Sequence, residues 1–450
     1  MMKVKKDKVK LITLGCSKNL VDSEHIMAQF RSNDIELTKD EKKADTVIIN
    51  TCGFIEFAKQ ESIDTILAAV ENKKKGNIKN LYVAGCLSDR YKKDLEKDIP
   101  EVDMYFGATS RPKTIIGILN ELGVDYKRNL IGERLLTTPG HYAYLKISEG
   151  CDNPCSFCAI PIMRGGHVSK PMDEIINEAG LLVKKGVKEL IIIGQDTTFW
   201  GMDIHKKRRL ADVLENLSAI DGIEWIRLMY AYPSRFPDDL IPVIRDNGKI
   251  CKYIDIPIQH VSDNVLKSMR RRITKKNLIA VLEKLRNDIP GIAIRTTVLT
   301  GYPGETEKDF TELLDFLKEF RFDRLGVFTY SEEDGTHAAN IPDNISVKEK
   351  IARQKAILDV QKEISEENNR NSLGTVVKVL IDRKESNYYI GRTFKDAPEI
   401  DQEVYIEGSV ELKKGEFCDV KIFDYEEFDL FGELEIKSRK ADYKTLEFII

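Results

Sequence analysis

Three cysteines stand close together in the stretch "SEGCDNPCSFC", residues 148–158: Cys151, Cys155 and Cys158. Their spacing would suit one face of a helix, but Pro154 lacks the amide hydrogen that a helix needs and restricts the residue before it. The stretch is therefore predicted to be a loop that wraps a bound group. Three thiolates suit an iron–sulfur cluster in which one iron has no protein ligand. An open metal position binds a further molecule, as open catalytic zinc sites bind water.

A zinc ion completed by a histidine, His141 or His167, is the alternative for this loop. Structural zinc sites usually combine two pairs of cysteine or histidine at short spacings. The C-x3-C-x2-C spacing does not match that pattern, which favours the cluster.

A second set of three cysteines is spread widely along the N-terminal part of the chain. Cys16, Cys52 and Cys86 each end a short apolar run: "LITLGC", "VIINTC" and "LYVAGC". If these runs are parallel strands, their carboxyl ends lie at one edge of a sheet, where open α/β sheets bind ligands. Because all three cysteines occupy the same position after a strand, the sequence predicts that they form a second metal site. The alternative is three buried apolar cysteines, a common environment for this residue.

With the aromatic Phe157 directly before its last cysteine, the C-x3-C-x2-C loop resembles the radical S-adenosylmethionine (SAM) superfamily. The resemblance implies a 4Fe–4S cluster on Cys151, Cys155 and Cys158, whose open iron is chelated by the amino and carboxylate groups of SAM. One electron from the cluster then splits SAM into methionine and a 5′-deoxyadenosyl radical. The cofactor carries the difficult chemistry and the protein supplies orientation and a dry pocket. No side-chain acid or base is expected to be catalytic.

Residues just past other apolar runs are candidates for binding SAM. By the same resemblance, "IIIGQDTT" would meet the amino group of SAM, "IPIQHVSDN" its ribose and "TTVLTGYPGET" its adenine. Arg295 lies inside the apolar run at 293–300, and is either a buried ion-pair member or a clamp for the cofactor carboxylate. The candidate cofactor-binding residues are Phe157, Gly194, Gln195, Asp196, Gln259, Arg295 and Gly301.

Alternating strand and helix patterns are expected to position both cysteine sets. Residues 8–123 predict a small α/β domain with a parallel sheet. Residues 137–368 predict six βα units, which is too few to close an eight-unit barrel and implies an open, partial one. From 371 to 440 only short strand patterns follow at roughly ten-residue spacing, which predicts a small closed β-barrel.

The composition of the chain indicates the cellular compartment. The chain has 450 residues, 8 cysteines and a formal net charge of −4. No apolar run approaches the ~20 residues of a membrane span, and the N-terminal residues lack the apolar core of an export signal. We therefore expect a cytoplasmic protein with reduced thiols and no membrane association. Cys251 and Cys418 lie outside both sets and are expected in apolar cores.

The segments "TLGCSKNLVDSE" and "NTCGF", followed by the radical SAM motif and the C-terminal barrel, resemble the radical SAM methylthiotransferase family, whose barrel is called a TRAM domain. The resemblance spans nearly the whole chain. It implies two 4Fe–4S clusters, the second on Cys16, Cys52 and Cys86. In the family one SAM methylates a sulfur at the second cluster, another yields the radical that removes hydrogen from a carbon, and the methylthio group is joined there. A sulfur donor and a one-electron reductant of flavodoxin or ferredoxin type would be partners.

Two branches of this family differ in substrate. One modifies isopentenyladenosine in tRNA, and the other the β-carbon of an aspartate in the twelfth small-subunit ribosomal protein. The segments "SEGCDNPCSFCAIPIMRG", "YAYPSRFP" and "YIDIPIQHVSDNVLKSMRR" resemble the second, RimO-type branch, although Lys170 stands where that family usually has arginine.

Charge is an independent indication of the substrate. Residues 375–450 carry 12 Lys and Arg against 18 Asp and Glu, a net charge of −6. Such a barrel would repel phosphates and would suit a basic ribosomal protein. We therefore expect an aspartate methylthiotransferase. A tRNA methylthiotransferase is the alternative, and a non-catalytic two-cluster electron carrier or assembly scaffold is a more remote one.

Overall fold

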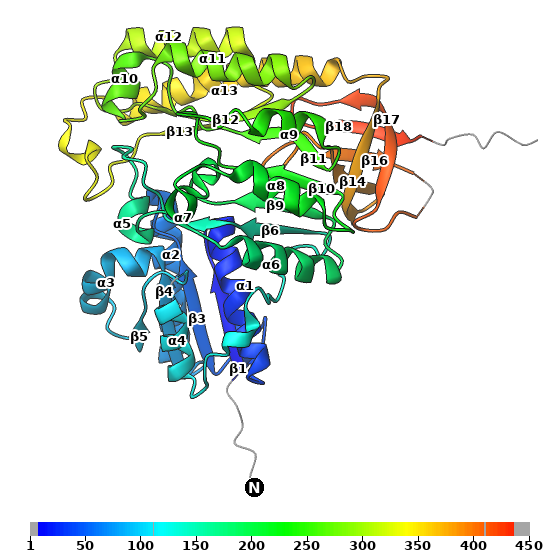
Figure 1. Cartoon of the computed structure of the whole chain (residues 1–450). Helices are drawn as coiled ribbons and strands as arrows, with labels where there is room; N and C mark the ends of the chain where they lie inside the picture. The colour runs from blue at the N-terminus through cyan, green and yellow to red at the C-terminus, as the bar shows by residue number, and fades with distance from the viewer. Residues whose placement is uncertain (1–7, 111, 409–410, 436–450) are drawn as a thin grey trace, which may run out of the picture. The chain divides into compact units, whose positions relative to one another are not determined.

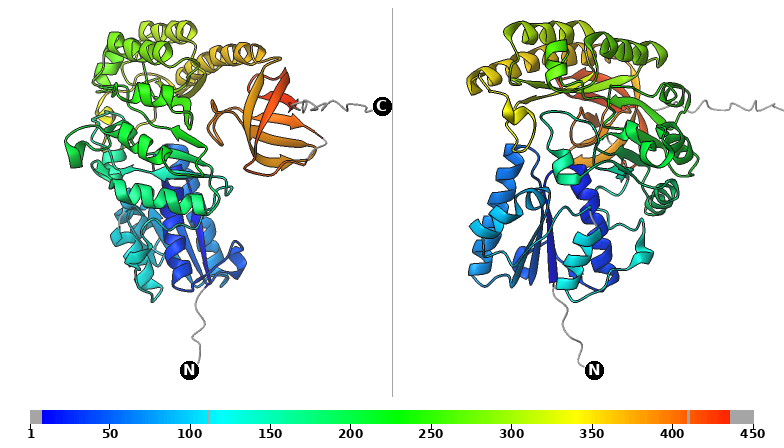
Figure 2. Two further views of the ribbon diagram at one scale, coloured as in Figure 1. Left: turned by 45° about the vertical axis from the view of Figure 1, so that its right-hand side comes forward. Right: turned by 60° about the vertical axis from the view of Figure 1, so that its left-hand side comes forward.

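The computed structural model describes residues 8–110, 112–408 and 411–435. The chain divides into two compact units, Met1–Ile364 and Ser365–Ile450. The first contains two parallel sheets and the second a closed β-barrel (Figures 1 and 2). Residues 436–440, the end of the predicted barrel segment, lie outside the described residues, and the domain boundaries set at 123, 137, 368 and 371 stay a prediction. In the described part of the chain, every helix is too short or too polar to cross a membrane.

The N-terminal sheet has five strands, all parallel. In sheet order they are β2 (Glu36–Leu37), β1 (Lys8–Thr13), β3 (Thr46–Thr51), β4 (Asn80–Gly85) and β5 (Met104–Tyr105). The helices that follow the strands are α1 (Ser17–Ser32), α2 (Glu56–Lys74), α3 (Cys86–Asp98) and α4 (Pro112–Glu121). The expected α/β domain is therefore present, with two short edge strands that apolar runs did not predict.

Helices cover both faces of this sheet, because successive residues of a strand point to opposite sides. On one face Val47 and Ile49 of β3 pack with α2 and α3. On the other, Ile48 packs with Ile26 and Phe30 of α1 and with α4. Figure 2 shows the resulting three layers in blue and cyan. A sheet buried on both faces explains why its strands are continuous apolar runs.

The second sheet has six parallel strands in chain order, so it is an open partial barrel as predicted. Its strands are β6 (Tyr142–Lys146), β9 (Glu189–Ile193), β10 (Trp225–Leu228), β11 (Ile250–Asp255), β12 (Ala293–Thr300) and β13 (Arg324–Thr329). The helices that pack against it in one core are α6 (Met172–Lys184), α8 (Leu210–Ser218), α9 (Leu240–Asp246), α11 (Lys275–Asp288) and α12 (Glu307–Phe320). Cys251 lies in β11 and is buried, as expected.

Short elements surround the mouth of the second sheet. They are β7 (Ser148–Glu149), α5 (Ile160–Arg164), β8 (Val168–Ser169), α7 (Met202–His205) and α10 (Asp263–Ser268). After β13 the long helix α13 (Val347–Arg370) runs across the boundary between the two units.

The C-terminal unit contains the predicted closed barrel. In barrel order its strands are β14 (Val376–Glu385), β15 (Tyr388–Arg392), β16 (Val404–Glu407), β18 (Leu430–Leu434) and β17 (Phe417–Tyr425). Every second residue points inward, as with Val379 and Ile381 of β14. Cys418 is half-buried against this core, which agrees with a packing role.

Candidate cysteine centres

Cys16, Cys52 and Cys86 lie at the carboxyl edge of the first sheet, past the neighbouring strands β1, β3 and β4. Cys16 is the N-cap of α1, Cys52 follows β3 directly, and Cys86 is the first residue of α3. The strand order 2-1-3-4-5 reverses between β1 and β3, and open α/β sheets bind ligands at such a point. Gly15 has φ +84°, and a methyl group there would lie 2.6 Å from Cys52 Sγ, so glycine permits the close approach.

The three thiols of this centre affect each other electrostatically. Burial raises the pKa of Cys86 to about 12, and the nearby Cys16 and Cys52 add to the rise. Burial also raises the pKa of Cys52, again with a contribution from Cys16. The structure therefore brings together three cysteines that lie far apart in sequence. Binding a metal cluster here requires the thiol protons to leave, so cluster affinity depends on pH.

Cys151, Cys155 and Cys158 lie in the loop between β7 and α5, as the proline predicted. Backbone hydrogen bonds hold this loop: the Cys151 amide donates to Gly165 O (3.1 Å) and the Cys158 amide to Cys155 O (3.2 Å). Burial raises the pKa of Cys151 to about 11 and that of Cys158 to about 12. Cys155 adds to both rises, so these three thiols are also neighbours.

The donor sets fit clusters better than a single metal ion. All six cysteines are free thiols. Among the described residues, no three His, Cys, Asp or Glu side chains are placed to hold one metal ion. Neither histidine of the zinc alternative forms such a group with the cysteines of the loop, and His167 Nε2 bonds Ser169 Oγ at 3.0 Å while His141 packs on Tyr142. In a cubane cluster each thiolate binds a different iron, so the cluster suits thiols that are neighbours but are not placed around one ion.

Two residues that sequence reasoning did not assign contact Cys155. Arg271 Nη1 donates to Cys155 Sγ at 3.4 Å, and the Tyr232 hydroxyl lies 3.6 Å from the same sulfur. The Arg271 guanidinium stacks on the Tyr232 ring, 4.3 Å from its centroid. Arg271 belongs to the basic run "MRRR" at 269–272, and only its burial, which sequence does not show, distinguishes it from its exposed neighbours Arg270 and Arg272.

Gly194, Gln195 and Asp196 follow β9 and reach the cysteine loop. Asp196 Oδ2 accepts from Asn153 Nδ2 at 2.8 Å, and Asn153 donates through its amide to Cys151 Sγ at 3.4 Å. Gln195 Nε2 donates to Glu149 Oε1 at 2.8 Å, while Gln195 Oε1 is buried with no hydrogen-bond partner in the described structure. An acceptor left open beside a cluster loop fits the amino group of SAM.

The other predicted SAM residues are spread along the same edge. Gln259 lies four residues past the end of β11 and Gly301 directly follows β12, both with positive φ (70° and 71°), but no described hydrogen bond joins them to the cysteine loop. Phe157 packs against the apolar group around Leu299 and Tyr302. Arg295 Nη1 pairs with Asp255 Oδ1 at 3.0 Å, which is the ion pair that sequence analysis offered as one alternative.

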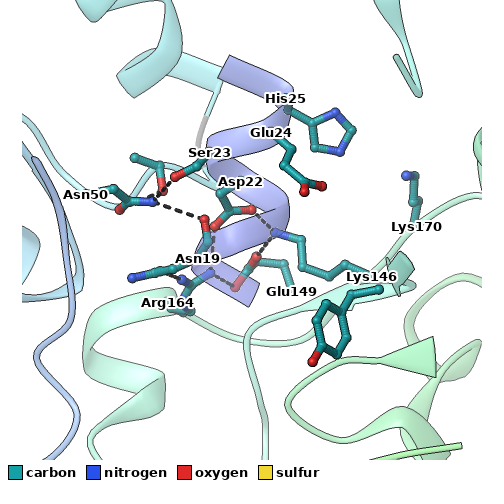
Figure 3. Close-up of polar contacts among 12 residues, drawn as sticks. Asn19, Asp22, Ser23, Glu24, His25, Asn50, Lys146, Glu149, Arg164 and Lys170 are labelled. Carbon is teal, nitrogen blue, oxygen red and sulfur yellow. Dashed lines mark hydrogen bonds and ion pairs between the residues drawn. The ribbon is translucent and has the colours of Figure 1, made fainter. Parts of the chain in front are cut away.

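A buried ionic network lies between the two centres, and Figure 3 shows its members Asp22, Lys146, Glu149 and Arg164. Arg164 of α5 donates through Nε to Cys86 Sγ (3.4 Å) and through Nη1 to Asp22 (3.1 Å) and Glu149 (2.9 Å). Lys146 bonds both carboxylates as well, at 2.7 Å for Glu149. Because Glu149 also accepts from Gln195, a continuous set of hydrogen bonds runs from a cysteine of one centre to the expected SAM side of the other.

A second buried ion cluster ties α1 to α6. Arg134 donates to Glu24 of α1 and, at 2.8 Å, to Glu178 of α6, and all three side chains are fully buried. Burial would raise the pKa of Glu178, but Lys170 and Arg134 hold it at about 2. Lys170, the departure from the family's usual arginine, is therefore occupied as the ion-pair partner of Glu178.

Comparison with known families divides the chain in the same way as the fold. Residues 8–107 match a model described as uncharacterized protein family UPF0004, residues 145–317 the radical SAM superfamily, and residues 373–434 the TRAM domain. A uS12 methylthiotransferase RimO of Christiangramia forsetii is 51% identical over 446 residues, covering 99% of this chain and 98% of that protein. A protein of the same name from Cytophaga hutchinsonii is 54% identical over 95% of this chain and 98% of its own length. The chain belongs to the RimO family of radical SAM methylthiotransferases.

Membership in the RimO family makes the chain a radical SAM enzyme, and the family's domains imply SAM and iron–sulfur clusters. Among solved structures, the radical SAM methyltransferase TsrM from Kitasatospora setae is similar with a TM-score of 0.54 at 12% identity, covering 72% of this chain and 75% of that one. The cobalamin-dependent radical SAM enzyme OxsB is similar with a TM-score of 0.51 at 14% identity, covering 79% and 56%. At such identities the likeness concerns the fold alone.

Proposed function

We propose that this protein transfers a methylthio group to the β-carbon of an aspartate in ribosomal protein uS12. The observation that carries the proposal is identity of 51% and 54% to RimO proteins over nearly the full length of both chains. The two cysteine centres support it, because a methylthio transfer needs both a source of radicals and a site for the sulfur.

Two 4Fe–4S clusters are proposed, one on each cysteine set, with SAM at the open iron of the first. When bound, the first cluster supplies the electron that starts radical chemistry on SAM, and the second supplies a position for the transferred sulfur. The SAM-binding residues are proposed to be Phe157, Gly194, Gln195, Asp196, Gln259, Arg295 and Gly301, and the cluster ligands are Cys16, Cys52, Cys86, Cys151, Cys155 and Cys158.

The chain's own residues orient these groups. Gln195 is held by Glu149, which leaves its Oε1 to accept a hydrogen bond from the cofactor. The hydrogen bond from Asn153 to Asp196 joins the cysteine loop to the segment after β9. Arg271 places a positive charge at Cys155 Sγ, where a cluster thiolate carries negative charge. Hydrogen bonds of this kind to cluster sulfurs tune the reduction potential.

The barrel supports a protein substrate rather than RNA. Its net charge is −6 over residues 375–450. The end of β17 and the turn after it expose two aromatic rings, Phe423 (46%) and Phe428 (51%), beside exposed acidic residues at 424, 426 and 427. Exposed rings flanked by acids suit a basic protein, since aromatic residues anchor interfaces and charge complementarity selects the partner.

We place the reaction in the cytoplasm, with a one-electron reductant of flavodoxin or ferredoxin type and a separate sulfur donor as partners. The decisive experiment is an anaerobic assay of the reconstituted protein with SAM, sulfide and dithionite, offered uS12 and tRNA together. Mass spectrometry should find the methylthio group on the uS12 aspartate. Methylthiolated tRNA with unmodified uS12 would favour the tRNA alternative, and absence of SAM turnover would favour a non-catalytic carrier or scaffold.

A further inference from the structure

Lys18 is a buried lysine in the first turn of α1, two residues after Cys16. Only 8% of its surface is exposed. Its ammonium group lies 3.0 Å from the centroid of the Tyr230 ring. A lysine is seldom buried to this extent without a partner, so its charge requires an explanation.

Tyr230 lies just past β10 of the second sheet, so Lys18 of the N-terminal domain contacts the segment that follows this strand. Tyr230 follows β10 with φ 57°, and its backbone is held in place by Asp255 and Thr197. Two residues later, Tyr232 places its hydroxyl 3.6 Å from Cys155 Sγ. The Lys18 ammonium therefore joins α1, whose N-cap is Cys16, to the segment after β10 that also carries the Cys155 contact.

No described carboxylate pairs with Lys18. Asp22, one helical turn further along α1, would be the usual partner at i+4. Its two oxygens accept instead from Lys146 and Arg164. Glu149 accepts from the same two cations and from Gln195. Two cations and two carboxylates thus balance each other, and neither of these carboxylates is left to pair with Lys18.

The buried ammonium group of Lys18 is suited to bind an anionic group of another molecule. The ring of Tyr230 offers a cation–π contact, but this compensates only part of the cost of burying a charge. A carboxylate would offset the rest of this cost by accepting charge-assisted hydrogen bonds from the ammonium group.

We propose that Lys18 binds the side-chain carboxylate of the substrate aspartate, an inference that rests on the proposed function. The carboxylate is bonded directly to the β-carbon, so fixing it fixes the reacting carbon between the two centres. Holding a reactant in a defined geometry removes much of the entropic barrier to its reaction. A site built to pair a carboxylate also rejects a substrate that lacks one, because the ammonium is then left buried without a partner.

Lys18 is thus a specificity-determining residue, and a double-mutant cycle tests it. The holoenzyme and its Lys18→Met variant are each titrated with uS12 and with uS12 in which asparagine replaces the target aspartate. We expect Lys18→Met to weaken binding of the aspartate form by roughly ten- to a hundredfold, the range of one hydrogen bond between charged groups. Binding of the asparagine form should change by less than about twofold, because the lost pair was absent there.

Two controls separate this role from a structural one. Lys59→Met removes another buried lysine of the same domain, one that is ion-paired with Glu333, and should leave the preference for aspartate intact. Lys18→Arg keeps the charge and should retain part of the preference. Iron content and 5′-deoxyadenosine formation should be normal in Lys18→Met.

The opposite outcomes are equally distinct. Equal weakening of both uS12 forms, or loss of iron in Lys18→Met, would assign Lys18 to support of the protein or of the N-terminal cluster and overturn the inference. An unchanged preference for aspartate in Lys18→Met would overturn it as well. A wild-type enzyme that leaves uS12 unmodified would overturn the proposed function itself, and with it the inference.

Discussion

At the scale of single residues, both centres combine buried thiols with a positively charged donor. Arg164 directs Nε at Cys86 Sγ and Arg271 directs Nη1 at Cys155 Sγ, each at 3.4 Å. Each arginine also satisfies other groups, Asp22 and Glu149 for Arg164 and Pro257 O for Arg271. The donors are therefore fixed before any cluster binds, which is the condition for a preorganised site.

Replacing Cys155 with alanine is expected to abolish SAM cleavage. A centre reduced from three thiolates to two should not retain a cubane cluster, and the described residues provide no spare cysteine at this loop. The measurement is 5′-deoxyadenosine formed with dithionite, together with bound iron. Cys251→Ala is the matched control, since Cys251 is buried in β11 away from both sets. Substantial 5′-deoxyadenosine from the Cys155 variant would refute the assignment.

His260 is expected to make stability fall in mild acid. Burial lowers its pKa from 6.5 to about 4, and its Nδ1 accepts from the Ser262 amide, so the folded protein holds it neutral. Between these two pH values the unfolded chain binds the proton and the folded chain does not. Stability is therefore fully present above pH 6.5 and is lost progressively as pH falls toward 4, by roughly 1.4 kcal/mol per pH unit.

The variant His260→Asn isolates this effect, because its side-chain oxygen can replace Nδ1 as acceptor without titrating. Urea unfolding at several pH values should show the wild type losing about 2 kcal/mol relative to the variant between pH 6.5 and 4.5. Parallel pH profiles for the two proteins would show that another group is responsible.

At the scale of elements, parallel strands assemble the second centre. The ends of β1, β3 and β4 meet at one edge because the strands are adjacent and run in one direction. The N-terminal sheet is then tied to the radical SAM sheet by α1, whose Glu24 pairs with Arg134 and whose Asp22 pairs with Lys146 and Arg164. Removing one partner of a buried ion pair of this kind costs about 3–5 kcal/mol.

Changing Cys16, Cys52 and Cys86 together to alanine should remove about half of the bound iron and leave SAM cleavage measurable. Methylthio product should disappear, because the site for sulfur is lost while the SAM centre on the other sheet remains. Iron analysis and mass spectrometry of the same samples provide the readout. Unchanged iron content would mean that a second cluster, if present, is bound elsewhere.

At the scale of the whole molecule, charge is distributed unevenly along the chain. The complete sequence carries −4, whereas residues 375–450 alone carry −6. An acidic barrel attached to a nearly neutral enzyme is an arrangement that favours encounter with a basic protein.

Reversing exposed barrel acids should weaken binding of uS12. Asp424→Lys combined with Glu426→Lys changes the barrel's charge without touching either cysteine set, so SAM cleavage should be normal. The loss of affinity should shrink as salt rises, because screening acts over ~8 Å at physiological salt. The matched control is Glu61→Lys with Asp64→Lys on α2, which makes the same change in net charge on another surface. Tighter binding of tRNA by the barrel variant, with uS12 binding unchanged, would point to the tRNA alternative.

Much of this molecule follows from its sequence alone. Apolar runs of β type predicted the main strands of both parallel sheets, and the alternation of strand and helix patterns predicted six βα units where the second sheet has six parallel strands. The position of each cysteine just past a strand placed it at a sheet edge, because parallel strands carry all their carboxyl ends to one side. The strands could be predicted from the local sequence because a strand that is buried on both faces consists of a continuous run of apolar residues.

The tertiary structure alone decided which charged residues belong to the centres. Arg164 and Arg271 resemble any surface arginine in the sequence, since pairing with a carboxylate or a sulfur across the fold leaves no local pattern. The ion-pair partner of Arg295 could not be predicted from the sequence either, because Asp255 lies 40 residues away from it. Strand position is encoded by neighbours along the chain, whereas the partner of a buried charge is chosen by contacts between elements that only folding brings together.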